Sequence, residues 1–142
     1  MKYADLILPL AMPKPLTYGI PVQWQGLLQP GTRVEVQVGK NKLYAAIVLR
    51  IHDERPESFS IKPIKNIIDA APLVSQQQLD LWQWVASYYM CSLGEVMQAA
   101  LPAHFKLMNE SVLAWSEHLQ DIPAGLSNDA FTIAETLYHK RT

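Results

Sequence analysis

The sequence predicts a mainly β fold with added α structure: a small, strongly curved antiparallel sheet or barrel, followed by two packed helices. Three observations in the 142-residue chain support this fold class. Apolar and polar residues alternate over 33–38, which is the period of a half-buried strand. Ten prolines are spread along the chain and favour short strands over a helical bundle. Near Leu73 the hydrophobic spacing changes to that of a helix.

A hairpin over residues 30–51 is the expected centre of the sheet. Pro30-Gly31 marks a turn before its first strand, and Gly39-Lys40-Asn41-Lys42 supplies residues that can reverse the chain. The return segment 43–51 is almost wholly apolar, as expected for a central strand. The two lysines beside Gly39 could meet a phosphate together with backbone N–H groups, and ordinary solvated lysines are the alternative.

Three shorter strands are expected around this hairpin, over residues 3–10, 16–21 and 61–68. Pro9 predicts that the first of them ends at a sheet edge. Pro13-Lys14-Pro15 is expected to be a stiff, extended loop, because proline fixes its own φ and restricts the residue before it. Segment 24–29 is expected to be a connector, and the polar segment 52–60 an exposed loop.

The first helix is expected to begin after Ser75, a suitable N-cap, and to end near Met90. Its predicted apolar stripe consists of Leu79, Trp82, Ala86 and Tyr89. The aromatic residues in and beside this stripe are Trp82, Trp84, Tyr88 and Tyr89. Helix-spaced aromatic residues usually pack into a core, so we expect these four to cover the sheet. A platform on which nucleotide bases stack is the alternative.

A capping box predicts the second helix. Ser92 and Glu95 have the spacing S-x-x-E, and Cys91 and Val96 stand in the positions of a hydrophobic staple. The helix is expected over 93–101 and to end before Pro102. A linker over 104–110, a strand over 112–115 and a helix over 128–139 are expected to follow. The chain then stops with little sign of a finished domain, so we expect a truncated second domain.

Charge is distributed unevenly, although the net charge is only −1. Up to Lys65 there are nine lysines and arginines against five acidic residues, and from Asn66 onward three against eight. A basic, strand-rich part could face a polyanion, and ordinary scatter of surface charge is the alternative. No apolar run is long enough to span a membrane, and no secretory leader is evident, so a soluble, cytoplasmic protein is expected.

The motifs of common enzymes are absent from the sequence, which contains no G-x-x-x-x-G-K-[ST], G-x-S-x-G or H-E-x-x-H. The scattered histidines are expected to be exposed and not to bind metal; they are His52, His104, His118 and His139. Cys91 is the single cysteine, which excludes an internal disulfide and a multi-cysteine zinc site, and it is expected to be a small buried hydrophobic residue. No catalytic residues are predicted.

Several motifs occur together in one order and are more specific together than alone. They are Lys14-Pro15-Leu16-Thr17-Tyr18, Pro30-Gly31-Thr32-Arg33-Val34-Glu35-Val36-Gln37-Val38-Gly39-Lys40, Lys62-Pro63-Ile64, Trp84-Val85-Ala86-Ser87-Tyr88-Tyr89, Gly94-Glu95-Val96 and Ala100-Leu101-Pro102. With these motifs, residues 1–105 resemble the 3′-DNA-binding domain of the PriA family of primosomal replication-restart helicases (primosomal protein N′). Residues 106–142 resemble a linker and the truncated start of that family's winged-helix domain.

The resemblance implies an OB-like module that captures the 3′-OH end of the nascent leading strand at stalled forks, without base specificity. The pocket residues that it implies are Leu16, Thr17, Tyr18, Gly39, Lys40 and Lys62, with Lys14 and Lys42 as secondary DNA contacts. Many family members have an aromatic residue where Leu16 stands and an acid where Thr17 stands. Stacking and backbone N–H groups suit such capture, because neither reads base edges.

The resemblance also implies what lies beyond this fragment. Full-length members are ATP-dependent 3′-to-5′ DNA helicases that use ATP with Mg and structural Zn, whereas no cofactor is expected in this fragment. The implied partners are forked DNA with a 3′-OH end, single-strand-binding protein and other primosome proteins, with nucleoid association and no membrane. The alternative function is a protein-interaction adaptor with a Trp/Tyr surface. Convergence of Lys14, Lys40 and Lys62 near Thr17 would favour DNA, and a dominant apolar groove would favour the adaptor.

Overall fold

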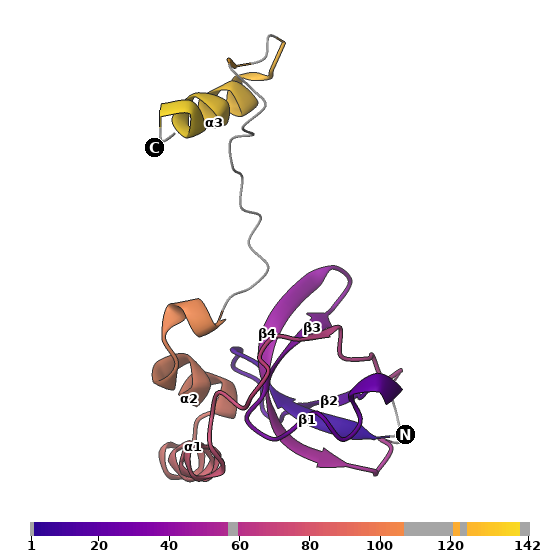
Figure 1. Ribbon diagram of the computed structural model, residues 1–142. Coiled ribbons are helices and arrows are strands. Elements are labelled where there is room, and N and C mark those ends of the chain that lie inside the picture. The colour runs from indigo at the N-terminus through magenta and orange to yellow at the C-terminus, as the bar shows by residue number, and fades with distance from the viewer. Residues whose placement is uncertain (1, 57–59, 107–120, 123–124, 140–142) are drawn as a thin grey trace. The chain divides into compact units, whose positions relative to one another are not determined.

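The computed structural model describes residues 2–56, 60–106, 121–122 and 125–139. The chain divides into two compact units, Met1–Asn109 and Glu110–Thr142. The first unit contains a curved sheet and two helices (Figure 1). The second contains α3 (Asn128–His139), the helix expected over the same residues. The predicted strand at 112–115 lies outside the described residues, and the winged-helix assignment of 106–142 stays a prediction.

The sheet of the first unit has five strands: β1 (Tyr3–Ile7), β2 (Leu16–Gly19), β3 (Arg33–Val38), β4 (Lys42–His52) and β5 (Asn66–Ile67). Their spatial order is β2-β1-β4-β3-β5, and every pairing is antiparallel. The long strand β4 lies at the centre, and its residues 44–48 are buried. The apolar return strand of the predicted hairpin is therefore confirmed as the middle of the sheet.

The sheet is strongly curved but does not close into a full barrel. At the end of the edge strand β2, Gly19 forms an isolated parallel bridge with Pro63, which precedes β5. The Gly19 N–H donates to the carbonyl of Lys62 at 3.0 Å, and the Ile64 N–H donates to the carbonyl of Gly19 at 3.0 Å. The β1–β4 register also shifts between Asp5 and Leu6, and such an irregularity bends a strand. The predicted curved, OB-like sheet is confirmed.

Two hydrophobic cores lie on opposite faces of the sheet. The inward face buries a cluster that includes Leu6, Val34 and Val36. The outward face packs Ile7 and Ile47 against the helices in a second cluster, called the helix-side core. It consists of Ile7, Ile47, Val74, Leu79, Trp82, Val96 and Met97. Cys91 is half-buried at the margin of this second cluster, where it behaves as a small hydrophobic residue.

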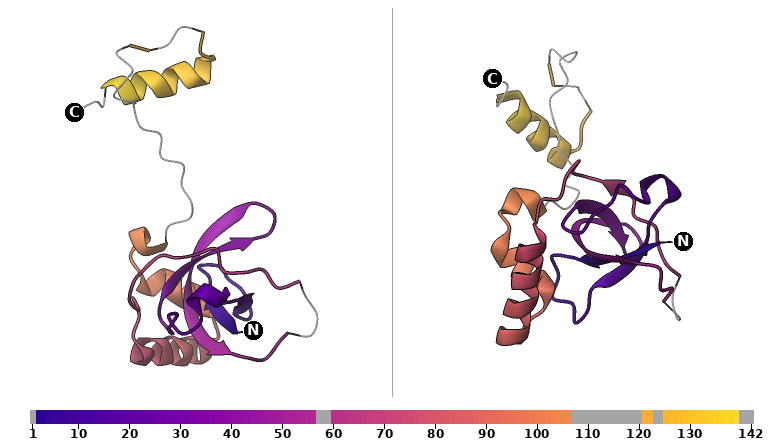
Figure 2. Two further views of the ribbon diagram at one scale, coloured as in Figure 1. Left: turned by 45° about the vertical axis from the view of Figure 1, so that its right-hand side comes forward. Right: turned by 60° about the horizontal axis from the view of Figure 1, so that its bottom comes forward.

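Helices α1 (Gln76–Tyr89) and α2 (Leu93–Ala100) lie side by side against one face of the sheet (Figure 2). Both begin at the predicted capping residues. The Gln78 N–H donates to the Ser75 hydroxyl, and the Gln78 side-chain oxygen accepts a hydrogen bond from the Ser75 N–H at 2.9 Å. Ser92 and Glu95 form the same reciprocal pair. Among the described residues before Leu73, the only helical segment is the short η1 (Val22–Trp24), so the change to helical structure near Leu73 agrees with the sequence pattern.

Three strands are shorter than predicted, and a proline follows or interrupts each one. Strand β1 ends at Ile7 ahead of Pro9, and β2 ends at Gly19 ahead of Pro21. Strand β5 spans only Asn66–Ile67, because Pro63 has no N–H to donate and the segment before it bonds Gly19 instead. The predictions located the strands but overran their ends.

The predicted linker at 104–110 begins as ordered structure. A short 3₁₀ helix, η2 (Ala103–Lys106), follows α2. Arg33 of β3 holds it: one guanidinium nitrogen donates to the carbonyl of Phe105 at 3.1 Å, and the guanidinium carbon lies 5.3 Å from the centre of the Phe105 ring. The same guanidinium binds both carboxylate oxygens of Asp69, at 2.9 and 2.8 Å. Residues 107–110 lie outside the described residues.

Candidate nucleic-acid-binding site

A hollow of about 360 Å³ opens between the edge strand β2 and the tip of the β3–β4 hairpin. Its wall is formed by segments 15–18, 37–39 and 60–62, together with Pro56. These segments are far apart in the sequence. They meet because the sheet curves until β2 approaches the segment that precedes β5.

Hydrogen bonds between these segments hold the wall together. The buried Tyr18 hydroxyl donates to the carbonyl of Gln37 at 3.0 Å, and burial raises the pKa of this phenol, so Tyr18 stays a neutral donor. The ammonium of Lys62 donates to the carbonyl of Gly39. The side chain of Gln37 also donates to the carbonyl of Lys40 and stabilises the turn. Strand β2, the hairpin tip and segment 60–62 therefore form one connected surface.

Gly39 leaves the hairpin tip open. Its φ is +64°, a backbone conformation that residues other than glycine adopt only with strain. A Cβ added there would have no described atom within 4 Å, so the space over this backbone is free. Because glycine has no side chain, a ligand in the hollow can approach the backbone of the turn closely.

The structure brings most of the predicted pocket residues together. The hollow is lined by Leu16, Thr17, Tyr18, Gly39 and Lys62. Lys40 and Lys42 are exposed at the hairpin and do not belong to its wall. Lys14 lines a neighbouring hollow that also contains Thr17. Of the three lysines expected to converge near Thr17, Lys62 and Lys14 therefore line two separate hollows that share Thr17, and Lys40 lines neither, so the three do not meet at one site.

The neighbouring hollow has a volume of about 410 Å³ and shares Pro15, Thr17 and Pro56 with the first. Lys14, Arg50 and Arg55 contribute positive charge to its wall, Asp5 and Glu54 contribute negative charge, and His52 also lines it. The fixed charges leave a surplus of one positive charge. Positive charge beside an apolar hollow suits a ligand with a phosphate attached to a less polar group.

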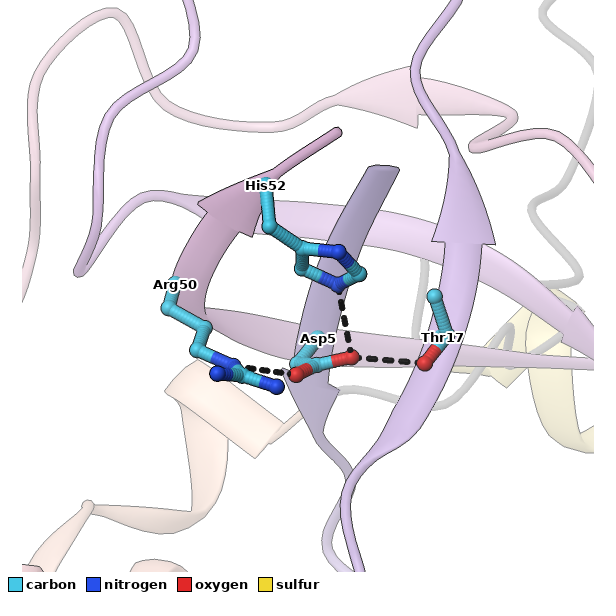
Figure 3. Close-up of polar contacts among 4 residues, drawn as sticks. All are labelled: Asp5, Thr17, Arg50 and His52. Carbon is cyan, nitrogen blue, oxygen red and sulfur yellow. Dashed lines mark hydrogen bonds and ion pairs between the residues drawn. The ribbon is translucent and has the colours of Figure 1, made fainter. Parts of the chain in front are cut away.

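Thr17, Asp5 and Arg50 form a row across three neighbouring strands (Figure 3). Asp5 of β1 is directly opposite Thr17 of β2 on one side and Arg50 of β4 on the other. The Thr17 hydroxyl donates to Asp5 Oδ1 at 2.6 Å, and Arg50 Nε donates to Asp5 Oδ2 at 2.5 Å. The Nε2 atom of His52 lies 3.2 Å from Asp5 Oδ1. Asp5 therefore has partners on both oxygens.

The environment of Asp5 keeps its carboxyl ionised. Burial favours the neutral acid, but the hydrogen bonds from Thr17, Arg50 and His52 together outweigh burial and hold the pKa of Asp5 below its usual value. Asp5 is buried as a residue, whereas Thr17 is half-buried where the two hollows meet. A negative charge is thus fixed directly behind a pocket residue.

The sequence pattern did not predict Asp5, Arg50 and His52 as site residues. His52 was expected in an exposed loop, but β4 continues through it, and its side chain is only 14% exposed. The one available signal was Asp5 itself, a charged residue in an otherwise apolar strand, since a buried charge requires partners. Which residues would be those partners depends on strand register, which the sequence pattern did not specify.

The aromatic residues of α1 are not where they were expected. Trp82 is 6% exposed in the helix-side core, but Trp84, Tyr88 and Tyr89 are 58%, 67% and 69% exposed. Trp84 and Tyr88 are one helical turn apart and stack with ring centres 5.1 Å apart, and Tyr88 meets Tyr89 edge-on at 5.0 Å. The prediction that all four cover the sheet is therefore wrong for three of them. One narrow helix face can enter the core, and Leu79 and Trp82 occupy it.

Comparison with known proteins decides the family. The model of the PriA family's 3′DNA-binding domain (3′BD) matches residues 5–102, which are 98 of the 142 residues. The chain belongs to the PriA 3′DNA-binding domain family. The matched segment contains the curved sheet except Tyr3 and Ala4, together with both hollows and the two packed helices, so the family's DNA-binding description applies to the unit that carries the candidate site.

Individual relatives agree with this assignment. The chain is 33% identical over 104 residues to the replication restart protein PriA of Chlamydia trachomatis and 32% identical over 107 residues to that of Haemophilus influenzae. These matches cover 70% and 75% of this chain but 14% of each relative. The PriA of Bacillus subtilis is 25% identical over 126 residues, which are 87% of this chain and 16% of the relative. The chain thus spans about one seventh of the length of these relatives.

Proposed function

We propose that this chain captures the 3′-OH end of a DNA strand, in the manner of a module that recognises the nascent leading strand at a stalled fork. The observation that carries the proposal is that Leu16, Thr17, Tyr18, Gly39 and Lys62 line one hollow, although they come from three distant parts of the sequence. These residues supply an apolar wall, an open backbone turn and one cation. Such a set suits a single terminal nucleotide better than a long duplex.

The composition of the hollow supports capture without base specificity. Base identity is read by side-chain donors and acceptors placed against base edges, whereas stacking and backbone contacts are indifferent to it. Leu16 and Val38 contribute apolar contact, and Gly39 contributes accessible backbone. Lys62 supplies charge toward a phosphodiester. A pocket that meets one or two phosphates also accounts for a DNA-binding unit within a chain of net charge −1.

The second hollow extends this arrangement to the next phosphate. It begins at Pro15 and Thr17, where the first hollow ends, and Lys14, Arg50 and Arg55 line it. A strand whose last nucleotide occupies the first hollow would pass this positive wall as it leaves. Lys40 and Lys42, exposed on the hairpin, would then be peripheral contacts with the DNA backbone.

Within a longer protein, this unit would position a replication-restart helicase at a fork. The ATP- and Mg-dependent motor and the structural Zn implied by the family resemblance would belong to other segments. Forked DNA with a free 3′-OH end would be the ligand of the unit, in the cytoplasm and on the nucleoid. For the chain itself, the described residues include no helix long and apolar enough to cross a membrane.

Fluorescence anisotropy on tailed duplexes that end in 3′-OH or 3′-phosphate tests the capture function. The wild-type chain should bind the 3′-OH end more tightly. Gly39→Val should bring both ends to a similar weak affinity, because its side chain enters the hollow. Gly26→Val is the matched control, since Gly26 also has a positive φ, of +93°, and open space around it but lies outside both hollows.

Two outcomes would refute the capture function. One is a wild-type chain that binds both ends equally. The other is a folded Gly39→Val variant that keeps the wild-type preference for the free hydroxyl. Loss of that preference in the Gly26→Val control would instead attribute the effect to strain in a turn.

The exposed aromatic cluster of Trp84, Tyr88 and Tyr89 supports a second function, the protein-interaction adaptor. A stacked aromatic face on a capped, rigid helix suits contact with a partner protein, and tryptophan and tyrosine are enriched at such interfaces. Single-strand-binding protein and other primosome proteins are the candidate partners. Trp84→Ala with Tyr88→Ala should abolish a pull-down of purified single-strand-binding protein and leave 3′-end binding unchanged. Retention of the pull-down would refute the adaptor function.

A further inference from the structure

The Thr17 hydroxyl has one proton to donate, and the structure shows where that proton goes. A hydroxyl donates once and can accept twice. Thr17 donates to Asp5 Oδ1 over 2.6 Å, a length typical of a hydrogen bond to a charged oxygen. The Thr17 oxygen is therefore left as an acceptor for any group that enters the hollow.

Asp5 has little freedom to release this bond. Its backbone is paired with both neighbouring strands, opposite Thr17 and opposite Arg50. Its second oxygen is held by Arg50 Nε at 2.5 Å, and His52 Nε2 lies 3.2 Å from the first. The carboxylate is thus fixed from three sides (Figure 3). It positions the hydroxyl and places a negative charge directly behind it.

We propose that Asp5 is the residue that makes this pocket select a free 3′-hydroxyl, by holding Thr17 as a hydrogen-bond acceptor and by repelling a 3′-phosphate. The proposal rests on the capture function proposed above and assigns a role to a side chain outside the wall of the terminal-nucleotide hollow. Asp5 is a positioning residue, because it acts through Thr17.

Two physical effects follow from this arrangement and can be separated. A terminal 3′-hydroxyl has a proton to donate to the Thr17 oxygen, whereas a 3′-deoxy end has none. A 3′-phosphate presents acceptor oxygens and carries a charge of roughly −1.5 to −2 at neutral pH. It therefore meets both an acceptor and the charge of Asp5. The order of affinity should be 3′-OH, then 3′-deoxy, then 3′-phosphate.

Arg50 completes the arrangement from the other side. Its guanidinium is largely exposed and neutralises part of the Asp5 charge. It does not contact Thr17, because β1 lies between β2 and β4. Removing Arg50 should therefore strengthen the repulsion of a 3′-phosphate and leave the contact between Thr17 and a 3′-hydroxyl intact.

The test measures affinities of the full 142-residue chain for one tailed duplex with three different ends: 3′-OH, 3′-deoxy and 3′-phosphate. Thr17→Val has nearly the shape of threonine and should lose the advantage of 3′-OH over 3′-deoxy, a fall of about tenfold in that ratio. It should keep the penalty against 3′-phosphate. Asp5→Asn should do the reverse and raise the affinity for 3′-phosphate toward that for 3′-deoxy.

Controls separate these effects from loss of fold. Thr17→Ser should restore the advantage of 3′-OH. Arg50→Gln removes one partner of Asp5 but should keep both the order of the ends and the advantage of 3′-OH. Circular dichroism melting establishes that each variant is folded, and if Asp5→Asn does not fold, Arg50→Gln decides, because it leaves the Asp5 charge less neutralised and should increase the penalty against 3′-phosphate.

The outcomes also separate this inference from the capture function. If the wild-type chain does not distinguish the three ends, the capture function is wrong, and the role of Asp5 fails with it. If the wild-type chain prefers 3′-OH but folded Thr17→Val keeps the full advantage, or Asp5→Asn keeps the full phosphate penalty, only the role assigned here is overturned.

Discussion

The hollow beside β2 and the outer face of α1 are two candidate contact surfaces that the chain builds in opposite ways. The hollow takes residues from three segments that are distant in sequence, and strand register and sheet curvature bring them together. The aromatic face takes Trp84, Tyr88 and Tyr89 from one helix, within six consecutive residues of α1. A surface of the first kind exists only when the sheet is folded, whereas the second requires little more than the helix. This difference separates the site proposed for a DNA end from the surface proposed for a protein partner.

The largest effect should come from the two tryptophans of α1. Trp82 is buried in the helix-side core, so Trp82→Ala should lower the free energy of unfolding by about 3–5 kcal/mol. Trp84 is exposed, so Trp84→Ala should lower it by less than about 1 kcal/mol. Urea unfolding of both variants measures the difference. Equal losses would mean that α1 has no outer face of the kind described.

The next effect concerns the junction of the sheet with α1. Gly31 has a φ of +84°, and a Cβ there would lie 1.8 Å from the carbonyl oxygen of Val74. Gly31→Ala should therefore destabilise the chain by about 2–4 kcal/mol through the clash and the strained backbone. Gly26→Ala is the control, because its φ is also positive but its surroundings are open. Thermal melting that shows equal costs would contradict the tight packing at Gly31.

A smaller effect should separate stability from both contact surfaces. Ser92→Ala removes the cap of α2 and should cost about 1 kcal/mol, measured by urea unfolding. Affinity for a 3′-OH end should not change, because Ser92 lies outside the hollow beside β2. A variant that keeps its stability but loses DNA binding would contradict the capping role.

The pH dependence of the same cap has a definite sign. The hydrogen bond from the Ser92 N–H, and then that from its hydroxyl, lower the pKa of Glu95 below its usual value of 4.5. A carboxyl whose pKa is lower in the folded state adds stability above the unfolded pKa and loses it as the pH falls through the folded pKa. Glu95→Gln should therefore flatten the loss of stability below about pH 4.5. If Glu95→Gln lost as much stability at acid pH as the wild-type chain, the capping role of Glu95 would be contradicted.

The smallest expected effect concerns the contribution of Lys62 to DNA binding in the hollow. Lys62→Ala should weaken binding of every DNA sequence about equally and should reduce the salt slope of binding by about 1, because one phosphate contact is lost. Lys42→Ala is the matched control, since Lys42 is exposed but does not line the hollow. Measured by anisotropy across a salt series, a larger loss for Lys42 than for Lys62 would place the DNA elsewhere.

The sequence predicted the features that depend on local patterns better than those that depend on contacts between distant residues. Period-2 alternation identified β3, an almost wholly apolar run identified β4, and S-x-x-E spacing identified the cap of α2, because all three are local patterns that tertiary contacts did not override. The ends of β1, β2 and β5 were overrun, because pairing partners and prolines decide them. Among the aromatic residues, the argument from helix spacing placed Trp82 correctly in the core but wrongly placed Trp84, Tyr88 and Tyr89 there.

The candidate site was predicted only where the family resemblance supplied it. Leu16, Thr17, Tyr18, Gly39 and Lys62 were named from matching motifs, and the structure brings them to one hollow. The polar residues Asp5, Arg50 and His52 had no motif, and only the β1–β2 and β1–β4 registers show that they lie beside Thr17. Register depends on contacts between distant residues, so a local pattern does not predict it.

Chemical-shift mapping of the isotope-labelled 142-residue chain with a short 3′-OH oligonucleotide tests the central claim most directly. The account predicts that the largest amide shifts fall at 16–18, 38–39 and 60–62 and shrink when the oligonucleotide ends in a 3′-phosphate. Amides of Trp84, Tyr88 and Tyr89 should not move. Shifts centred on the outer face of α1, or shifts in the hollow that are the same for both ends, would contradict it.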